Sequence, residues 1–170
     1  AQIAPAVRVA IGEEFGLPAG KNSVGKIFTA LRMLGFDTVF DTSFSADLTV
    51  VEEAAELVYK LEKGDKKYPL GNAMPLFTSC CPAWVRFVET KHPDILPYVS
   101  TCKSPMEMFG AVLKEHYKPA DEETGLETVS VAVMPCVAKK YEAAREEFKR
   151  NNVPDVDHVI TTKELVLMIK

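Results

Sequence analysis

The feature that most constrains the fold of this chain is the alternation of short apolar runs with segments of helical periodicity. Residues 129–134 form a β-branched run of strand length, and residues 137–150 after it have the spacing of an amphipathic helix. Strands that alternate with helices predict parallel pairing, because a parallel neighbour needs a long crossover connection. We therefore expect an α/β fold with a mainly parallel sheet flanked by helices.

The same reasoning places the other elements along the chain. Helices are expected over residues 6–15, 24–34, 45–63 and 105–116, from residue 83 and from residue 162, and strands over residues 38–41, 74–79 and 158–160. Residues 119–127 are polar and are expected to form a loop. The last helical pattern is unbroken at Lys170, so we expect the chain to be cut within a longer fold.

The composition excludes several classes of protein. The chain has 170 residues, enough for one domain with a substantial core, and a formal net charge of -4 with acids and bases interleaved. A nucleic-acid partner is not expected, since binding nucleic acid needs a basic face. No apolar run approaches the roughly 20 residues of a membrane-spanning helix, so no membrane span is expected.

The cysteines indicate a reducing environment. Four cysteines in 170 residues are too few for a disulfide-built secreted scaffold. Cys80 and Cys81 are adjacent, and neighbouring cysteines bridge each other only through a strained ring. The sequence therefore favours reduced thiols or metal ligands. Cys102 is expected to serve in packing, and none of the three histidines has the spacing of a metal ligand.

Two segments each place a cysteine where a predicted buried strand meets a helix. Cys80 and Cys81 follow residues 74–79, and Cys136 follows residues 129–134. Ligands of α/β sheets bind just beyond the strand ends, and a helix N-terminus stabilises a thiolate or an anionic cluster. Consecutive residues of an extended chain point in opposite directions, so one adjacent thiol is expected to anchor a metal group while the other faces a neighbouring compartment. The alternative, cysteines that serve as small core residues, stays open.

The sequence around these cysteines resembles a known family. Thr-Ser-Cys-Cys-Pro-Ala-Trp at residues 78–84 and Met-Pro-Cys-Val-Ala-Lys-Lys-Tyr-Glu at residues 134–142 are similar to the first and second signatures of iron-only (FeFe) hydrogenases. Further similar segments extend the likeness over nearly the whole chain: residues 4–8, 12–15, 34–37, 46–49, 103–105 and 159–162. The resemblance implies that residues 1–170 are the N-terminal part of the catalytic domain that binds the H-cluster, and one lobe of a two-lobed fold.

The resemblance also implies a cofactor and its ligands. In this family the H-cluster is a 4Fe–4S cubane joined through a cysteine sulfur to a two-iron unit with carbonyl, cyanide and dithiolate amine ligands. By position, Cys81 and Cys136 resemble two of the cubane ligands, and Lys139 resembles the lysine that binds a cyanide. The residues that resemble the lining of the two-iron pocket are Ala4, Pro5, Ala6, Ser104, Pro105, Met134 and Pro135, together with Lys139.

A proton route is a further implication of the resemblance. Cys80 is similar to the unligated thiol that passes protons to the bridging amine. Glu56, Ser100 and Glu53 are similar to the groups that lead from the surface to this thiol, in that order. Carboxyl and hydroxyl groups can accept and donate in turn, as a relay requires. From the residues alone, Glu53 and Glu56 lie three apart on one helix face, which is ordinarily a face of solvated acids.

One signature of the family is missing from the sequence. The third signature, Glu-x-Met-x-Cys-x-x-Gly-Cys, supplies the other two cubane cysteines, and no such segment occurs in the chain. We therefore expect a fragment or truncated polypeptide, or a chain that another subunit completes. By itself the chain is not expected to turn over hydrogen.

The function that the resemblance implies is reversible reduction of protons to dihydrogen, in the ferredoxin hydrogenase class. The expected partners are ferredoxin or another redox protein, the rest of the hydrogenase domain or a further subunit, and maturation proteins. A cytoplasmic location is favoured over a periplasmic one. The alternatives are a non-catalytic hydrogenase-like iron–sulfur protein of cluster assembly and a hydrogen-sensing regulatory member. Cys80, Lys139, Glu53 and Glu56 argue against the assembly protein, because these residues resemble groups that serve hydrogen chemistry rather than cubane binding.

Overall fold

A four-stranded parallel sheet is the centre of the structure. The computed structural model describes residues 1–63 and 75–170. The strands have the order β2–β1–β3–β6, and all neighbouring pairs in this sheet are parallel. Their bounds are Gln2–Ile3 for β1, Phe40–Asp41 for β2, Val131–Met134 for β3 and His158–Thr161 for β6. The expected α/β fold with mainly parallel pairing is confirmed.

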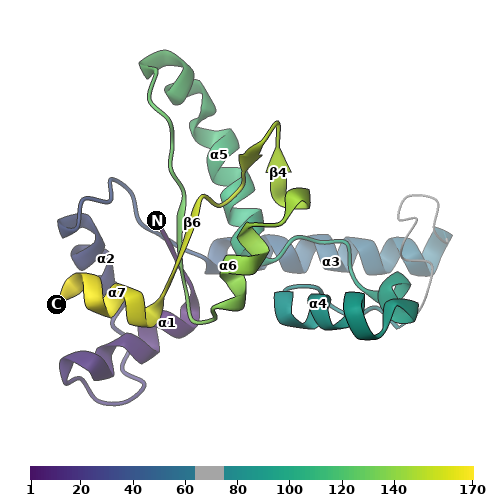
Figure 1. Cartoon of the computed structure of the whole chain (residues 1–170), viewed down its shortest axis with the longest axis horizontal. Coiled ribbons are helices and arrows are strands. Elements are labelled where there is room, and N and C mark those ends of the chain that lie inside the picture. The colour runs from purple at the N-terminus through teal and green to yellow at the C-terminus, as the bar shows by residue number, and fades with distance from the viewer. Residues whose placement is uncertain (64–74) are drawn as a thin grey trace.

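Helices surround this sheet and extend from it. The α-helices are α1 (Pro5–Ala10), α2 (Val24–Met33), α3 (Ser43–Lys63), α4 (Pro82–Lys91), α5 (Pro105–Thr124), α6 (Ala138–Ala143) and α7 (Thr162–Ile169). Short 3-10 helices are η1 (Ile11–Phe15), η2 (Pro93–Tyr98) and η3 (Glu146–Phe148), and β4 (Lys149–Arg150) pairs with β5 (Val153–Pro154) in an antiparallel ribbon. In Figure 1, α1, α2 and α7 gather at one side of the molecule, whereas α3 and α4 extend to the other. α5 packs against α3.

Local sequence explains where helices begin and end. Ser104 caps α5, since its side-chain oxygen accepts a hydrogen bond from the backbone N–H of Glu107 at 3.4 Å. Pro105 fits the first helical position, where its missing N–H costs nothing. Gly35 follows α2 with a φ of 97°, a left-handed conformation that suits glycine and ends the helix as expected.

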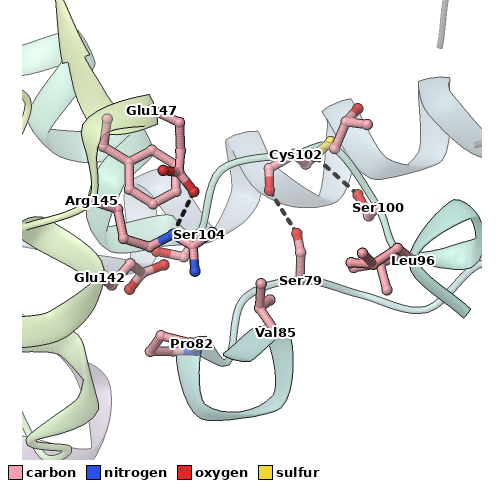
Figure 2. Close-up of a pocket in the computed structure, with 13 residues that line it drawn as sticks. Ser79, Pro82, Val85, Leu96, Ser100, Cys102, Ser104, Glu142, Arg145 and Glu147 are labelled. Atoms are coloured by element: carbon pink, nitrogen blue, oxygen red, sulfur yellow. Dashed lines mark hydrogen bonds and ion pairs between the residues drawn. The ribbon is translucent and has the colours of Figure 1, made fainter. Parts of the chain in front are cut away.

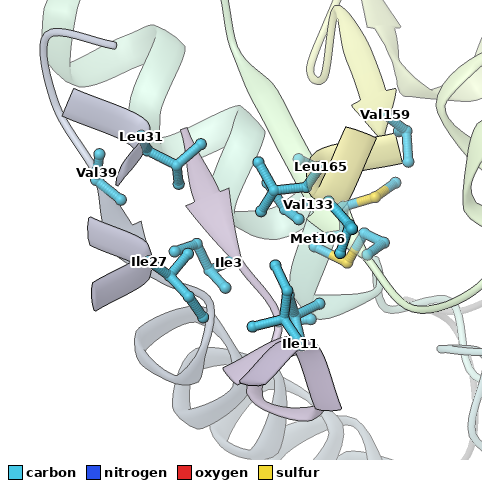
Figure 3. Packing of buried hydrophobic residues seen from close by; sticks show 14 of the residues in the cluster. Ile3, Ile11, Ile27, Leu31, Val39, Met106, Val133, Val159 and Leu165 are labelled. Carbon is cyan, nitrogen blue, oxygen red and sulfur yellow. The ribbon is translucent and has the colours of Figure 1, made fainter. Parts of the chain in front are cut away.

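The hydrophobic core lies between the sheet and the helices around it (Figure 3). Ile3, Val133 and Leu165 come from β1, β3 and α7, and each is 1% exposed or less. Burying a side chain of this size contributes roughly 1.5–3 kcal/mol. Met106 brings the first turn of α5 into the same core, and the buried side chain of Gln2 donates to the Met106 carbonyl oxygen at 3.0 Å. The start of α5 is thereby held against the sheet.

The strand expected over residues 74–79 is wrong for the part of it that the structure describes. Met74 lies outside the described residues. Residues 75–81 form a loop with one isolated parallel bridge, between Phe77 and Val99. The partner of this segment is the chain after η2 rather than a strand of the sheet, so the segment stays at the surface and Phe77 is 37% exposed. An apolar run of strand length does not by itself reveal which neighbour it meets.

α5 is longer than expected. It continues through Pro119 to Thr124, so no loop begins at residue 119. Its last turn is held from outside, because the Asp121 carboxylate accepts hydrogen bonds from the backbone N–H and the hydroxyl of Thr128, at 3.0 and 2.6 Å. These contacts compensate for the backbone hydrogen bond that a proline inside a helix removes.

α6 is shorter than expected. It ends at Ala143 rather than near Arg150, and residues 149–154 pair as a ribbon instead. The turn of this ribbon is formed by Asn151 and Asn152, whose φ angles are 52° and 65°. Asparagine tolerates the left-handed conformation better than other side chains do, so an adjacent pair favours a tight hairpin over a continuing helix.

Candidate functional site

Three of the four cysteines are exposed near helix starts. Cys80, Cys81 and Cys136 form no disulfide. Cys136 follows β3, one of the two central strands of the sheet, and Cys81 immediately precedes α4. Only Cys136 therefore stands beyond a sheet strand. The expectation that both cysteine segments leave strands of the sheet is wrong, because residues 75–81 are a loop.

The structure nevertheless brings the two cysteine segments together. The ammonium of Lys139 donates to the backbone carbonyl oxygen of Cys80 at 2.9 Å, across 59 residues of sequence. α4 packs against α6, and Arg145 after α6 forms an ion pair with Glu89 on α4. A second hydrogen bond from the Arg145 guanidinium to the same carboxylate is 3.1 Å long. The first and second cysteine motifs are thus neighbours in space.

Lys139 is held by two acceptors. Besides the Cys80 carbonyl oxygen, its Nζ contacts the Glu142 carboxylate at 2.6 Å, and its side chain is 14% exposed. The backbone N–H of Lys139 donates to the Cys136 carbonyl oxygen at 3.2 Å, so one turn of chain joins the lysine to the cysteine. An ammonium has three donors, and the contacts of the described residues use two of them. The third can serve an anion that binds beside Cys80.

Glu56 on α3 is a buried carboxylate with several partners. It is 0% exposed and accepts a hydrogen bond from the Ser100 hydroxyl at 2.6 Å and from the Thr101 backbone at 3.3 Å. Burial acts to raise the pKa of Glu56, but the hydrogen bonds from Ser100 and Lys60 outweigh it and hold this pKa below its usual value. The expected proximity of Glu56 and Ser100 is therefore observed as a direct contact.

Glu53 lies almost one turn before Glu56 and meets the segment that carries Cys80. One of its carboxylate oxygens is buried and has no hydrogen-bond partner in the described part of the chain. Burial raises the pKa of Glu53, the charge of Glu56 raises it further, and a hydrogen bond from the backbone of Ser79 acts in the opposite direction. Because Ser79 precedes Cys80, Glu53 lies beside the chain that presents the Cys80 thiol. Its raised pKa favours the protonated form.

Two neighbours of Glu56 are absent from the sequence-based expectations. Lys60 forms an ion pair with Glu56 at 3.1 Å, and the Lys60 side chain is 2% exposed. The Cys102 thiol donates to the same carboxylate at 3.7 Å, and burial raises the pKa of this thiol to about 11. Cys102 thus contributes a hydrogen bond as well as packing. The four-residue spacing from Glu56 to Lys60 is a sequence signal for the ion pair, whereas nothing in the sequence indicates the Cys102 contact.

A pocket of about 350 Å³ lies between these groups and the second cysteine motif (Figure 2). Ser79, Ser100 and Cys102 line one side of it, and Glu142 and Arg145 line the other. Figure 2 also shows the hydrogen bond of 2.7 Å from the Ser79 hydroxyl to the Cys102 carbonyl oxygen, which ties the loop before Cys80 to the loop after Ser100. The pocket therefore borders α6, which carries Lys139, and Ser100 and Cys102, whose side chains contact Glu56 on α3.

Most of the residues expected to line the cofactor pocket lie at or directly after the ends of neighbouring strands. Ala4 follows β1, and its N–H donates to the Val133 carbonyl oxygen on β3 at 3.0 Å, so residues 4–6 and 134–135 leave adjacent strand ends. Ser104 and Pro105 start α5, where Ser104 serves as the cap. The structure leaves Pro5, Ala6 and Pro135 exposed and Pro105 partly buried, and it buries Ala4, Ser104 and Met134.

The donor set fits one side of a cluster site. Across residues 1–63 and 75–170, no three His, Cys, Asp or Glu side chains are grouped closely enough to hold a metal ion. Cys81 and Cys136 offer exposed sulfur ligands, which suit iron–sulfur clusters, and Lys139 offers a cation beside them. These residues fit two thiolate positions and one anion contact of the H-cluster, and they do not complete its coordination.

Comparison with known families identifies the chain. The family model described as iron only hydrogenase large subunit, C-terminal domain, matches residues 1–170. The chain belongs to this family. The resemblance seen in the sequence is thereby confirmed. The terms hydrogenase, iron–sulfur protein and oxidoreductase apply to the hydrogenases that the chain resembles.

The chain is similar to hydrogenase subunits over nearly its whole length. It is 51% identical to the NADP-reducing hydrogenase subunit HndD of Solidesulfovibrio fructosivorans, covering 99% of this chain and 29% of that protein. It is 46% identical to the periplasmic [Fe] hydrogenase large subunit of Nitratidesulfovibrio vulgaris, covering 98% of this chain and 38% of that protein. The chain therefore spans less than half the length of these relatives.

A solved structure has the same fold. The apo form of [FeFe]-hydrogenase HydA1 from Chlamydomonas reinhardtii matches with a TM-score of 0.85 and 44% identity, covering 98% of this chain and 41% of that chain. At 34% identity, the chain is also similar to a probable cytosolic Fe-S cluster assembly factor of Nematostella vectensis, over 99% of this chain and 38% of that protein. None of the helices in the described ranges combines the length and the apolar character needed to cross a membrane.

Proposed function

We propose that residues 1–170 form one side of the catalytic site of an iron-only hydrogenase that reversibly reduces protons to dihydrogen. The observation that carries this proposal is the hydrogen bond from Lys139 to the Cys80 carbonyl oxygen, because it joins the two cysteine motifs around a cation. The other cluster ligands come from the rest of the hydrogenase domain or from a further subunit. The chain by itself is inactive.

Three residues of the chain hold the H-cluster in this proposal. Cys81 and Cys136 bind the cubane as thiolates, and their exposure leaves them accessible to a cluster that the partner region completes. Lys139 uses its remaining donor for a cyanide, which supplies the counter-charge that a largely buried ammonium needs. When bound, the H-cluster would pass on electrons received from the redox partner and would provide the iron centre at which protons are reduced.

The chain's own part in the reaction is to move protons. A proton that reaches the Glu56 carboxylate passes to the Ser100 oxygen, 2.6 Å away, as the Ser100 hydroxyl releases its own proton to the next carrier. Glu53 takes the proton next, since its raised pKa favours the protonated carboxyl. Cys80 is the last carrier, because it is exposed and its chain segment meets Glu53 through Ser79. Each group both accepts and donates, so the relay resets after every proton.

Substitution of the two adjacent cysteines tests this division of roles. In the complete, cluster-loaded protein, Cys80→Ala is expected to keep its iron but to lose hydrogen turnover by about two orders of magnitude or more, because the last carrier is gone. Cys81→Ala, the matched control, is expected to lose the cubane instead. Iron content, the electron paramagnetic resonance of the cubane and the hydrogen evolution rate are measured for both. Wild-type turnover in Cys80→Ala contradicts the relay, and loss of the cubane in that variant means that the two roles are exchanged.

The second candidate is a non-catalytic protein of iron–sulfur cluster assembly, which the similarity to the Nematostella vectensis factor favours. Within residues 1–63 and 75–170, Glu53 has a buried oxygen without a hydrogen bond and Lys139 has a donor to spare. Both features support the hydrogenase instead, since a conventional cluster needs neither. Infrared spectra of the protein produced with maturation proteins discriminate between the two. Carbonyl and cyanide stretching bands are expected for a hydrogenase, and their absence together with an intact cubane favours the assembly protein.

Partners and location belong to the proposal as well. The relatives are hydrogenase subunits, and we propose ferredoxin or a similar carrier as electron donor and maturation proteins as the source of the two-iron unit. The cytoplasm is the proposed compartment, because its reducing conditions suit four unbridged cysteines. The similarity to a periplasmic subunit makes the periplasm the alternative.

A further inference from the structure

A buried acid near Lys139 has no part in the proposed proton route. Glu107, in the first turn of α5, is 0% exposed, and neither carboxylate oxygen has a hydrogen-bond partner among the described residues. It occupies the third helical position, from which a glutamate commonly reaches back to the cap. Glu164 does so in α7, where its carboxylate accepts from the Thr161 backbone at 2.7 Å. Glu107 does not, so capping does not explain its burial.

Four charged side chains act on Glu107, and they form two ion pairs. Lys139 pairs with Glu142 at 2.6 Å, and Lys103 pairs with Asp155. Both acids are nearly fully buried. Burial raises the pKa of Glu107 to about 8, with further increases from the charges of Glu142 and Asp155, while Lys103 and Lys139 act to lower it. Lys103 and Lys139 already have a carboxylate each, and the half-exposed Arg150 is a further cation at Asp155, at 3.4 Å. Both buried acids are therefore paired when Glu107 keeps its proton.

The backbone packs closely around this group of charged side chains. Gly110 lies almost one turn after Glu107 on α5, and a Cβ at this position would meet the Asp155 carbonyl oxygen at 2.4 Å. The chain around Asp155 therefore packs directly on the helix backbone, with no space for a side chain between them. A site this tightly packed cannot relax around a new charge as water does, so a charge on Glu107 acts strongly on its neighbours.

We propose that Glu107 is a positioning residue which, as a neutral carboxylic acid, keeps the Lys139 ammonium between the Cys80 carbonyl oxygen and Glu142. This inference rests on the proposed role of Lys139 in binding an anionic ligand of the cofactor. When Glu107 ionises, its proton leaves to solvent and a third negative charge remains beside Lys103 and Lys139, while Arg150 stays at Asp155. That charge attracts Nζ of Lys139 inward, and the ammonium withdraws from Cys80 and from the anion. The protonation state of one buried acid thus sets how firmly the lysine holds the cofactor.

Infrared titration of the complete protein tests the proposal. In the cluster-free wild type, the C=O stretching band of a protonated carboxylic acid is expected to disappear with a midpoint near pH 8. In the cluster-loaded wild type, the cyanide bands are expected to shift with the same midpoint. Glu107→Gln keeps the neutral shape but cannot ionise, so it is expected to lack this acid band and to show cyanide bands that do not shift. Glu123→Gln, an exposed site on the same helix, is expected to behave as the wild type.

Two results overturn the proposal. One is a wild type without an acid band that titrates near pH 8, a measurement that needs no variant to fold. The other is a Glu107→Gln protein whose cyanide bands still shift as in the wild type, which means that the acid does not act on Lys139. A Lys139→Met protein separates this outcome from failure of the proposed function. If its cyanide bands match the wild type at every pH, Lys139 does not bind the cofactor, and the positioning role falls with it even though the Glu107 acid band persists.

Discussion

Three glutamates of this chain differ in how neighbouring groups balance the negative charge of the carboxylate. Glu56 is buried against Lys60 and Ser100, and its pKa lies below the usual value. Among the residues that the structure describes, one buried oxygen of Glu53 finds no hydrogen bond, and burial raises the pKa of Glu53. Neither oxygen of Glu107 finds one there, and its pKa is the most strongly raised of the three. A carboxylate that finds a cation stays charged, whereas one that is buried beside other acids keeps its proton.

Glu107→Gln is expected to remove a pH-dependent loss of stability. The pKa of Glu107 rises from 4.5 in the unfolded chain to about 8 in the folded protein. Between these values the folded state holds a proton that the unfolded state releases, so wild-type stability falls as pH rises through this window. As pH rises from below 4.5 to above 8, the free energy of unfolding of the variant should therefore gain about 5 kcal/mol relative to that of the wild type.

Chemical denaturation of the complete protein across this pH window measures the effect. The difference between the two proteins is the informative quantity, because other groups titrate equally in both. Glu123→Gln is the control and should follow the wild type at each pH. A stability difference that stays constant between pH 5 and about pH 9 would contradict a raised pKa at Glu107.

At the scale of helices and strands, prediction succeeded where local residues supply the signal. The helix from Val24 was expected from its apolar spacing, and its end from Gly35, and both are observed. The strand over residues 74–79 was wrong because that run pairs with a loop. α5 passes through Pro119 because contacts outside the helix hold its last turn. The errors therefore occur where contacts with residues far away in the sequence outweigh the local conformational preference of the segment.

The close approach of α5 to the chain at Asp155 gives a prediction for an element. Gly110→Ala is expected to destabilise the protein by about 3 kcal/mol, because the new methyl group overlaps the Asp155 carbonyl oxygen and backbone must move. Gly25→Ala is the matched control, since it lies in α2 with nothing within 4 Å of an added Cβ. That change should be neutral or stabilise by up to about 1 kcal/mol. Thermal denaturation of both variants checks the pair, and equal melting temperatures would contradict the close packing.

At the scale of the whole molecule, the site depends on contacts between segments far apart in sequence. Arg145 binds Glu89 across 56 residues, and Lys139 binds the Cys80 carbonyl oxygen across 59. The Ser100 hydroxyl meets Glu56 across 44. These three contacts bring both cysteine motifs and the acid-bearing helix into one region, where a pocket lies between the two motifs and Ser100.

Loss of the Arg145 contact should therefore affect cluster binding as well as stability. Arg145→Ala removes the charged hydrogen bonds that hold α4 against the chain after α6, and a loss of about 2 kcal/mol in stability is expected. Because the two proposed ligand cysteines are then less firmly placed, iron content per protein should also fall. Arg86→Ala is the control, since Arg86 is 58% exposed and its contact with Glu89 is longer, at 3.6 Å. Full iron content in Arg145→Ala would mean that the contact does not position the ligands.

The sequence by itself determined the parallel α/β class, most helices and the family, because periodicity, caps and cysteine motifs are properties of residues close together in the chain. It also indicated Glu53, Glu56, Ser100 and Lys139 as site residues through the resemblance. Only the tertiary structure decided that Glu107 is buried with no hydrogen bond from the described part of the chain, that Lys60 neutralises Glu56 and that the segment before Cys80 is a loop. Burial and charge balance depend on which distant segments meet, and local sequence does not encode that in any pattern that can be read along the chain.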